Sequence, residues 1–159
     1  MIKGTGNIAR ILQDRKGALF FASGVSNSGE TQRAAFEREY LMLLEQPRDN
    51  CLFYFSSISI FMKSSPYTIH KRIMEDIIAD CWKNFNIIRI GNLDWDTNPN
   101  TFLNFLRNKI SKGEEVEIKD EYRYMISKEQ LLFYTNNLPM KGKNTINVFG
   151  HMAKVKDLL

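Results

Sequence analysis

The sequence predicts an α/β fold: a short parallel sheet of about four strands with helices on both of its faces. The first observation behind this prediction is an alternation of short apolar runs, typical of buried strands, with longer helical segments over residues 1–98. In that order each strand connects to the next through a helix, and such crossovers make neighbouring strands parallel. The second observation is that the alternation ends at Pro99, after which we expect a small lobe.

The predicted elements follow one another without a linker or a repeat. We expect strands over residues 1–3, 18–22, 51–55, 86–90, 116–118, 122–126 and 145–149. We expect helices over residues 8–13, 30–45, 66–83, 102–110 and 128–138, and a closing helical turn at 155–159. We expect Gly17 to end the first helix as a C′ glycine. We expect Ser127 to be the N-cap of the helix over residues 128–138. The expected organisation is a single domain with a core at 1–98, a small lobe at 99–143, and a return strand and helix at 144–159.

The two longest helices are each expected to have one apolar face, with charged side chains opposite. In the helix over residues 30–45 the apolar face is formed by Ala34, Ala35, Tyr40, Leu41 and Leu44. In the helix over residues 66–83 it is formed by Ile69, Ile73, Ile77, Ile78 and Cys81.

The composition indicates a soluble globular protein, since 43% of the residues are hydrophobic and 25% are charged. No apolar run reaches the roughly 18 residues that a membrane span needs, and residues 1–4 lack the apolar segment of a secretory signal. Cys51 and Cys81 lie beside apolar residues and are expected to be buried free thiols, which fits a reducing cytoplasm. With 2 histidines and no metal-ligand spacing, no metal site is expected.

The net charge is +4, from 22 basic and 18 acidic residues, and the basic side chains are scattered along the chain. A nucleic-acid site needs a dense basic face with aromatic side chains between, so no nucleic-acid partner is expected. A mildly basic surface suits an anionic small molecule such as a nucleotide.

Four polar loops follow the predicted strands, at residues 4–6, 23–28, 56–59 and 91–96, and all are rich in Gly, Ser, Asn or Asp. In a parallel sheet, ligands bind beyond the carboxyl ends of the strands. We therefore expect these loops to converge on one binding site.

The first loop matches the pattern G-x-G-x-x-G/A through Gly4, Gly6 and Ala9. In that pattern the glycines allow a tight turn and a close approach of the backbone to a phosphate. A phosphate site and a plain glycine-rich turn both remain open at this point.

Tyr67 and Lys71 are four residues apart on a predicted helix and therefore share a face. A nearby ammonium favours the anion of a phenol, so the pair can act as a general acid/base at a carbinol or carbonyl. Ser57, at the end of the preceding strand, can hydrogen-bond the same substrate oxygen. The alternative is that Tyr67 is a partly buried helix residue and Lys71 a solvated one.

Five segments in the same order resemble the extended short-chain dehydrogenase/reductase family, and more narrowly its NAD-dependent nucleotide-sugar epimerases and dehydratases. They are residues 53–61, 65–75, 87–92, 122–126 and 146–150. The resemblance implies a Rossmann-like three-layer fold, here in a shortened form, with a parallel sheet and a small C-terminal substrate lobe.

The resemblance also implies a role for each matched residue. Tyr67 would be the acid/base, Lys71 its partner and the ligand of the nicotinamide ribose, and Ser57 the hydroxyl at the substrate oxygen. The other matched residues would lie beside NAD or NADP (Gly4, Gly6, Ser23 and Gly24) or hold the nucleotide sugar (Asn92 and Arg123).

The chain departs from the family in the half of the site that holds the adenosine. Two strand–helix units of the family are missing, because only residues 7–17 separate the glycine loop from the next strand. The acidic residue that holds the adenosine ribose lies about 20 residues past the glycines, where this chain has Ser26 and Asn27. Glu30 is the nearest carboxylate, so we expect NAD or NADP to be held weakly.

Three functions remain open. The first is an NAD(P)-dependent epimerase, dehydratase or reductase acting on a nucleotide-activated sugar, in a setting such as polysaccharide biosynthesis that the likeness alone implies. The second is a non-catalytic protein of the same fold that binds a nucleotide or a nucleotide sugar. The third is an oligomeric interaction protein, since the resemblance implies a possible homodimer through the helices at 30–45 and 66–83.

Overall fold

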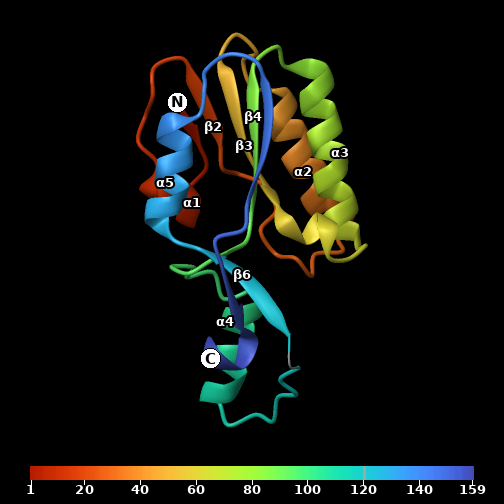
Figure 1. Ribbon diagram of the computed structural model, residues 1–159. Coiled ribbons are helices and arrows are strands. Elements are labelled where there is room, and N and C mark those ends of the chain that lie inside the picture. Colours follow the sequence, from red (N-terminus) through yellow and green to blue (C-terminus); the bar gives the residue numbers. More distant parts are fainter. Residues whose placement is uncertain (120) are drawn as a thin grey trace.

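The computed structural model describes residues 1–119 and 121–159 and contains two sheets (Figure 1). The main sheet has five parallel strands in the order β1-β2-β3-β4-β7. They are β1 (Ile2–Lys3), β2 (Ala18–Phe21), β3 (Cys51–Ser57), β4 (Phe85–Ile90) and β7 (Lys143–Val148). The predicted parallel α/β fold is confirmed, with one strand more than expected.

Helices cover both faces of the main sheet, as the three-layer prediction requires (Figure 1). On one face lie α2 (Arg33–Leu44) and α3 (Pro66–Cys81), and on the other lie α1 (Asn7–Ile11) and α5 (Lys128–Asn137). Alternate residues of the buried strands point to opposite faces. Phe20 and Phe53 therefore pack on the α5 side, while Leu19 and Leu52 pack on the α2–α3 side.

The second sheet is small and lies beyond the carboxyl ends of the main strands (Figure 1). It pairs β5 (Asn92–Leu93), β6 (Tyr122–Ile126) and β8 (His151–Lys154). Leu103 and Leu106 of α4 (Phe102–Ser111) pack with Met125 and Val155 to form its own core. No helix within residues 1–119 and 121–159 is long and apolar enough to cross a membrane.

Several predicted elements differ from the structure. The strand expected at 116–118 is wrong: that segment is irregular, and Val116 packs on the core under α4. The closing helix is a single 3-10 turn, and Gly17 lies in the turn before β2 because α1 already ends at Ile11. The strands β5 and β8 were not expected, since β5 has 2 residues and β8 is largely exposed. Ser127 caps α5 as predicted, in a capping box with Gln130.

The predicted apolar faces of the two long helices are only partly right. On α3, Ile78 is buried, and Ile77 and Cys81 pack against the same core. Tyr40 and Leu41 of α2 are exposed, whereas Glu39 beside them is fully buried. Ile69 and Ile73 of α3 are half exposed, and the buried face of α3 is largely polar. It consists of Tyr67, Thr68, His70, Lys71, Met74, Glu75 and Ile78.

A polar network explains why these side chains are buried. The Glu39 carboxylate accepts hydrogen bonds from Lys71 Nζ (3.0 Å), the Tyr54 hydroxyl (2.6 Å) and the Val25 amide (2.7 Å), and it pairs with His70 Nε2 at 3.0 Å. Burial by itself raises the pKa of Glu39. The Lys71 charge and the hydrogen bonds outweigh burial and hold this pKa well below its ordinary value. The network joins α2, α3 and β3.

A second buried carboxylate, that of Glu75 on α3, is paired in the same way. Glu75 accepts a hydrogen bond from the Ser56 hydroxyl (2.5 Å) and pairs with the Arg89 guanidinium at 2.5 Å. Because buried charges are stable only when paired, both carboxylates fix how α3 sits on β3 and β4.

Replacing Glu39 with glutamine should destabilise the protein and weaken its response to acid. The lowered pKa of Glu39 contributes stability that is present above the unfolded-state value of 4.5 and is lost as the pH falls below it. Glu39→Gln lacks this contribution and leaves the Lys71 charge buried without its partner, which costs about 3–5 kcal/mol near neutral pH. Urea denaturation at neutral and at acidic pH measures both effects.

Glu37→Gln is the matched control, because Glu37 lies on the same helix in an exposed pair with Arg33. Its free energy of unfolding should stay within about 0.5 kcal/mol of the wild type. Equal losses in the two variants, or the same pH dependence in Glu39→Gln as in the wild type, would contradict this account of the network.

Gly150, between β7 and β8, should tolerate alanine less well than Gly113 does. Both have a positive φ (+70° and +73°), so both substitutions strain the backbone by about 1–2 kcal/mol. A methyl group at Gly150 would also collide with the Met125 carbonyl of β6. A methyl group at Gly113 would meet no atom within 4 Å. In urea denaturation we expect Gly150→Ala to lose at least about 1 kcal/mol more than Gly113→Ala. Equal losses of stability in Gly150→Ala and Gly113→Ala would show that the close approach of Gly150 to Met125 is not needed.

Candidate functional site

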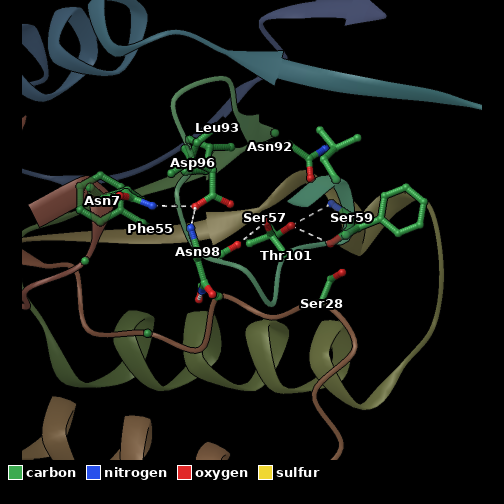
Figure 2. A pocket seen from close by; sticks show the side chains of 18 of the residues that line it. Asn7, Ser28, Phe55, Ser57, Ser59, Asn92, Leu93, Asp96, Asn98 and Thr101 are labelled. Atoms are coloured by element: carbon green, nitrogen blue, oxygen red, sulfur yellow. Dashed lines mark hydrogen bonds between the residues drawn. The ribbon is translucent and has the colours of Figure 1, made fainter. Parts of the chain in front are cut away.

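A cleft of about 540 Å³ lies at the carboxyl ends of the main strands, where the small sheet faces them. Each of the four polar loops contributes to its lining, through residues such as Gly6, Gly24, Ser57 and Asn92. Figure 2 shows polar side chains from these loops pointing toward one another. The described residues therefore bring the loops to one cleft, as the sequence predicts.

Ser57, Tyr67 and Lys71 all line this cleft. Ser57 ends β3, and its hydroxyl lies 2.6 Å from that of Ser59. Tyr67 and Lys71 come from the first turns of α3 and are 6% and 2% exposed, with Lys71 Nζ 5.7 Å from the centre of the Tyr67 ring. Within the described parts of the chain, no hydrogen bond joins the Tyr67 hydroxyl to Ser57 or Lys71.

Lys71 is not the solvated lysine of the alternative interpretation. Its ammonium donates to Glu39 and, at 3.2 Å, to the Tyr54 hydroxyl. Burial, followed by the Glu39 charge, raises the pKa of Tyr54 well above its ordinary value, so this phenol is neutral and Glu39 is the anionic partner of Lys71.

Gly24 lies over this ion pair. A Cβ at Gly24 would come within 2.8 Å of both Glu39 Oε1 and Lys71 Nζ, and Gly24 also lines the cleft. A side chain at this position would displace the pair. The glycine therefore lets the Lys71 ammonium lie directly beneath the cleft.

The residues expected beside a cofactor divide into two groups. Gly6 and Gly24 line the cleft, whereas Gly4 and Ser23 are not among its lining residues. Gly4 packs against the Ala22 carbonyl, where a Cβ would collide, so its place is explained by packing of the first loop on the end of β2.

The residues expected to hold a nucleotide sugar both line the cleft from the small sheet, Asn92 in β5 and Arg123 in β6. Asn92 donates to the Tyr124 carbonyl at 3.3 Å, and the Arg123 guanidinium lies 4.5 Å from the centre of the Phe102 ring. The cleft is also lined by Arg10, Lys63 and Arg107. Among its described lining residues Asp96 is the one acidic side chain, so the cleft favours an anionic ligand.

The structure adds Glu39, Asp96 and Phe102 to the residues considered from sequence. Glu39 is spaced four residues from both Ala35 and Leu43, which signals a position on the buried face of α2. Asp96 lies in one of the four predicted loops, but its contact with Asn7, 89 residues away, has no local signal.

The cleft suits only part of a dinucleotide. Gly24 after β2, Ser57 at the end of β3 and Lys71 of α3 line the cleft, where the resemblance would place a nicotinamide ribose. At the adenosine end, Glu30 does not line the cleft; its carboxylate accepts from the Thr31 and Gln32 amides. The residues present thus match the nicotinamide half and lack the ribose carboxylate of the adenosine half.

No protein-family model and no curated protein sequence matches this chain. The comparison with solved structures finds proteins of the same fold at 11–15% sequence identity. The Bordetella bronchiseptica enzyme WbmH, in complex with NAD⁺, matches with a TM-score of 0.68 at 13% identity, over 89% of this chain and 55% of that one.

Two further structures support the same fold. The UDP-glucuronic acid 4-epimerase of Bacillus cereus matches with a TM-score of 0.62 and 14% identity, over 95% of this chain and 59% of that one. The capsular polysaccharide assembling protein CapF of Staphylococcus aureus matches with a TM-score of 0.55 and 15% identity, over 89% and 42%. The chain thus shares a Rossmann-like fold with nucleotide-sugar epimerases and a dehydratase whose structures contain NAD, and it spans about half the length of the chains it matches.

Proposed function

We propose that the cleft binds a nucleotide-activated sugar and that the protein acts on it as an NAD(P)-dependent epimerase, dehydratase or reductase. The observation that carries this proposal is the common lining: Ser57, Tyr67 and Lys71 share one cleft with Gly6 and Gly24. The solved structures of the same fold support it, since their names include nucleotide-sugar epimerases in complex with NAD.

In this proposal Tyr67 takes a proton from, or returns one to, a hydroxyl of the sugar. The Ser57 hydroxyl hydrogen-bonds the same oxygen, and Lys71, fixed by Glu39, provides a positive charge 5.7 Å from the Tyr67 ring. A nicotinamide, when bound beside Gly24, supplies the hydride acceptor or donor. The buried ion pair keeps Lys71 from swinging away from the cleft.

The small lobe predicted at residues 99–143 would hold the nucleotide end of the substrate. Phe102 and Arg123 present an aromatic ring and a guanidinium to the cleft, which Asn92 and Arg107 also line. Guanidinium groups bind diphosphates through charge-assisted hydrogen bonds. A capsular or other polysaccharide precursor fits this site chemically.

A second candidate function is binding of the nucleotide sugar without turnover. The observation that favours it is the engagement of Lys71, whose ammonium already donates to Glu39 and Tyr54. A protein of this kind would bind the sugar nucleotide with no dependence on NAD or NADP.

Tyr67→Phe should abolish conversion while leaving binding intact. Wild-type protein is incubated with a UDP- or dTDP-hexose and NAD⁺ or NADPH, and the sugar products are separated by chromatography. Removing the Tyr67 hydroxyl should lower kcat by about 100-fold or more with KM little changed, because the proton transfer is lost but the sugar contacts remain.

Tyr40→Phe, on the exposed side of α2, is the matched control and should keep the wild-type rate. Calorimetry on the same sugar nucleotides runs in parallel. Saturable binding without conversion by the wild type would favour the second candidate, and equal rates in wild type and Tyr67→Phe would remove Tyr67 from the mechanism.

We also propose a homodimer through α2 and α3. The two helices lie side by side, joined by Glu39 and His70, and expose Tyr40, Leu41 and Ile73 on their outer side. Burial of such apolar side chains is the main driving force of stable dimers.

The double variant Leu41→Lys/Ile73→Lys should convert a dimer into a monomer, because each lysine places a charge in the proposed interface. Light scattering after size exclusion measures the mass. Phe133→Lys is the control, since Phe133 is equally exposed but lies on α5, across the main sheet. A monomeric wild type, or a dimer that survives the double variant, would contradict the proposed interface.

A further inference from the structure

The loop after β5, residues 94–101, reaches across the cleft to the glycine loop (Figure 2). Asn7, directly after Gly6, donates from its side-chain amide to Asp96 Oδ1 at 2.6 Å. Thr97 donates from its hydroxyl to Asn7 Oδ1 at 2.8 Å, and Trp95 Nε1 donates to the Asn7 carbonyl at 3.5 Å. Three consecutive residues of the loop therefore hold Asn7.

The Asp96 carboxylate is fixed on its own side of the cleft as well. Asp96 Oδ1 accepts a second hydrogen bond from the Asn98 amide at 2.9 Å. Asn104 of α4 donates to the carbonyls of Asp96 (2.9 Å) and Asn98 (3.0 Å). Asn98 in turn donates to the Ser26 hydroxyl at 3.1 Å, which ties the loop to the segment after β2.

The charge of Asp96 is not balanced by a direct partner. It is the one acidic side chain among the described residues that line the cleft, and none of the ion pairs of residues 1–119 and 121–159 includes it. Arg10, the basic lining residue on α1, donates instead to the Thr5 carbonyl at 3.1 Å. A diphosphate placed on Gly6 and Asn7 would therefore meet a fixed carboxylate.

We propose that Asp96 is a selectivity residue that disfavours a diphosphate at the glycine-loop end of the cleft. Like charges held a few ångströms apart repel strongly where water is partly excluded. The diphosphate of a nucleotide sugar is then directed toward Arg123, whose guanidinium lines the cleft over the Phe102 ring. This inference rests on the proposed function only in taking the cleft as the ligand site.

The test is isothermal titration with ADP-ribose, which has the diphosphate and adenosine of NAD but no nicotinamide. Wild type, Asp96→Asn and Asp94→Asn are compared at low ionic strength with a chelator present. Asparagine keeps the acceptor for Asn7 and removes the charge. Asp94→Asn removes the same charge two residues away, from an exposed side chain that does not line the cleft.

Asp96→Asn should bind ADP-ribose about tenfold more tightly than the wild type, whereas Asp94→Asn should bind like the wild type. The gain should shrink at high salt, where the repulsion is screened, and should be absent for adenosine, which has no phosphate. Asp96→Ser, which also removes the carboxylate, should show the same gain, and thermal melting checks that each variant is folded.

Unchanged or weaker binding in Asp96→Asn and Asp96→Ser would overturn the proposal. Absence of binding in all variants would do so too, because another feature would then exclude the diphosphate. In a parallel titration with Mg²⁺ in place of the chelator, an affinity that rises in the wild type but not in Asp96→Asn would also overturn it, since Asp96 would then bridge to the ligand through a cation. None of these results depends on sugar conversion, so they are distinct from failure of the proposed catalytic role of Tyr67.

Discussion

The buried ion pair of Glu39 and Lys71 is the constraint on which the rest of the site depends. A carboxylate without access to water is stable only with its charge matched and its oxygens hydrogen-bonded. Glu39 of α2 meets this condition through partners on α3, on β3 and in the loop after β2. Satisfying the pair fixes the rotation of α3 about its axis. It thereby decides that Tyr67 and Lys71 reach the cleft, while Ile69 and Ile73 face outward.

The two ends of the cleft differ in charge and in construction. One end has the Arg123 guanidinium and the Phe102 ring, held by β6 and α4. The other is formed by the glycine loop, tied to Asp96 and Thr97. A ligand in this cleft is therefore oriented by charge before any contact specific to its sugar or base is made. The shared fold of the epimerases and dehydratases supplies the scaffold, and this polarity comes from the residues of this chain.

Much of the fold could be predicted from sequence, because buried parallel strands appear as short apolar runs with polar loops at their ends. That pattern placed β2, β3 and β4 and brought Ser57, Tyr67 and Lys71 to one edge. The faces of α2 and α3 could be found only in part by counting apolar residues, since their buried positions include Glu39, His70 and Lys71, which satisfy one another. The link from Asn7 to Asp96 depends on tertiary structure alone.

The small sheet has a consequence for the order in which the molecule folds. Its strands begin at residues 92, 122 and 151, and they follow β4, α4 and β7 in the chain. No two of them form a hairpin, so the loop-closure entropy of every pairing is large until the main sheet has brought their ends together. Strands β1 to β4 can assemble from neighbouring strand–helix units. Strand β7 follows β5, α4, β6 and α5 in the chain, so it and the small sheet complete the fold last. The cleft, which needs both sheets, comes into existence only in this final step, so a nascent chain gains its binding site late.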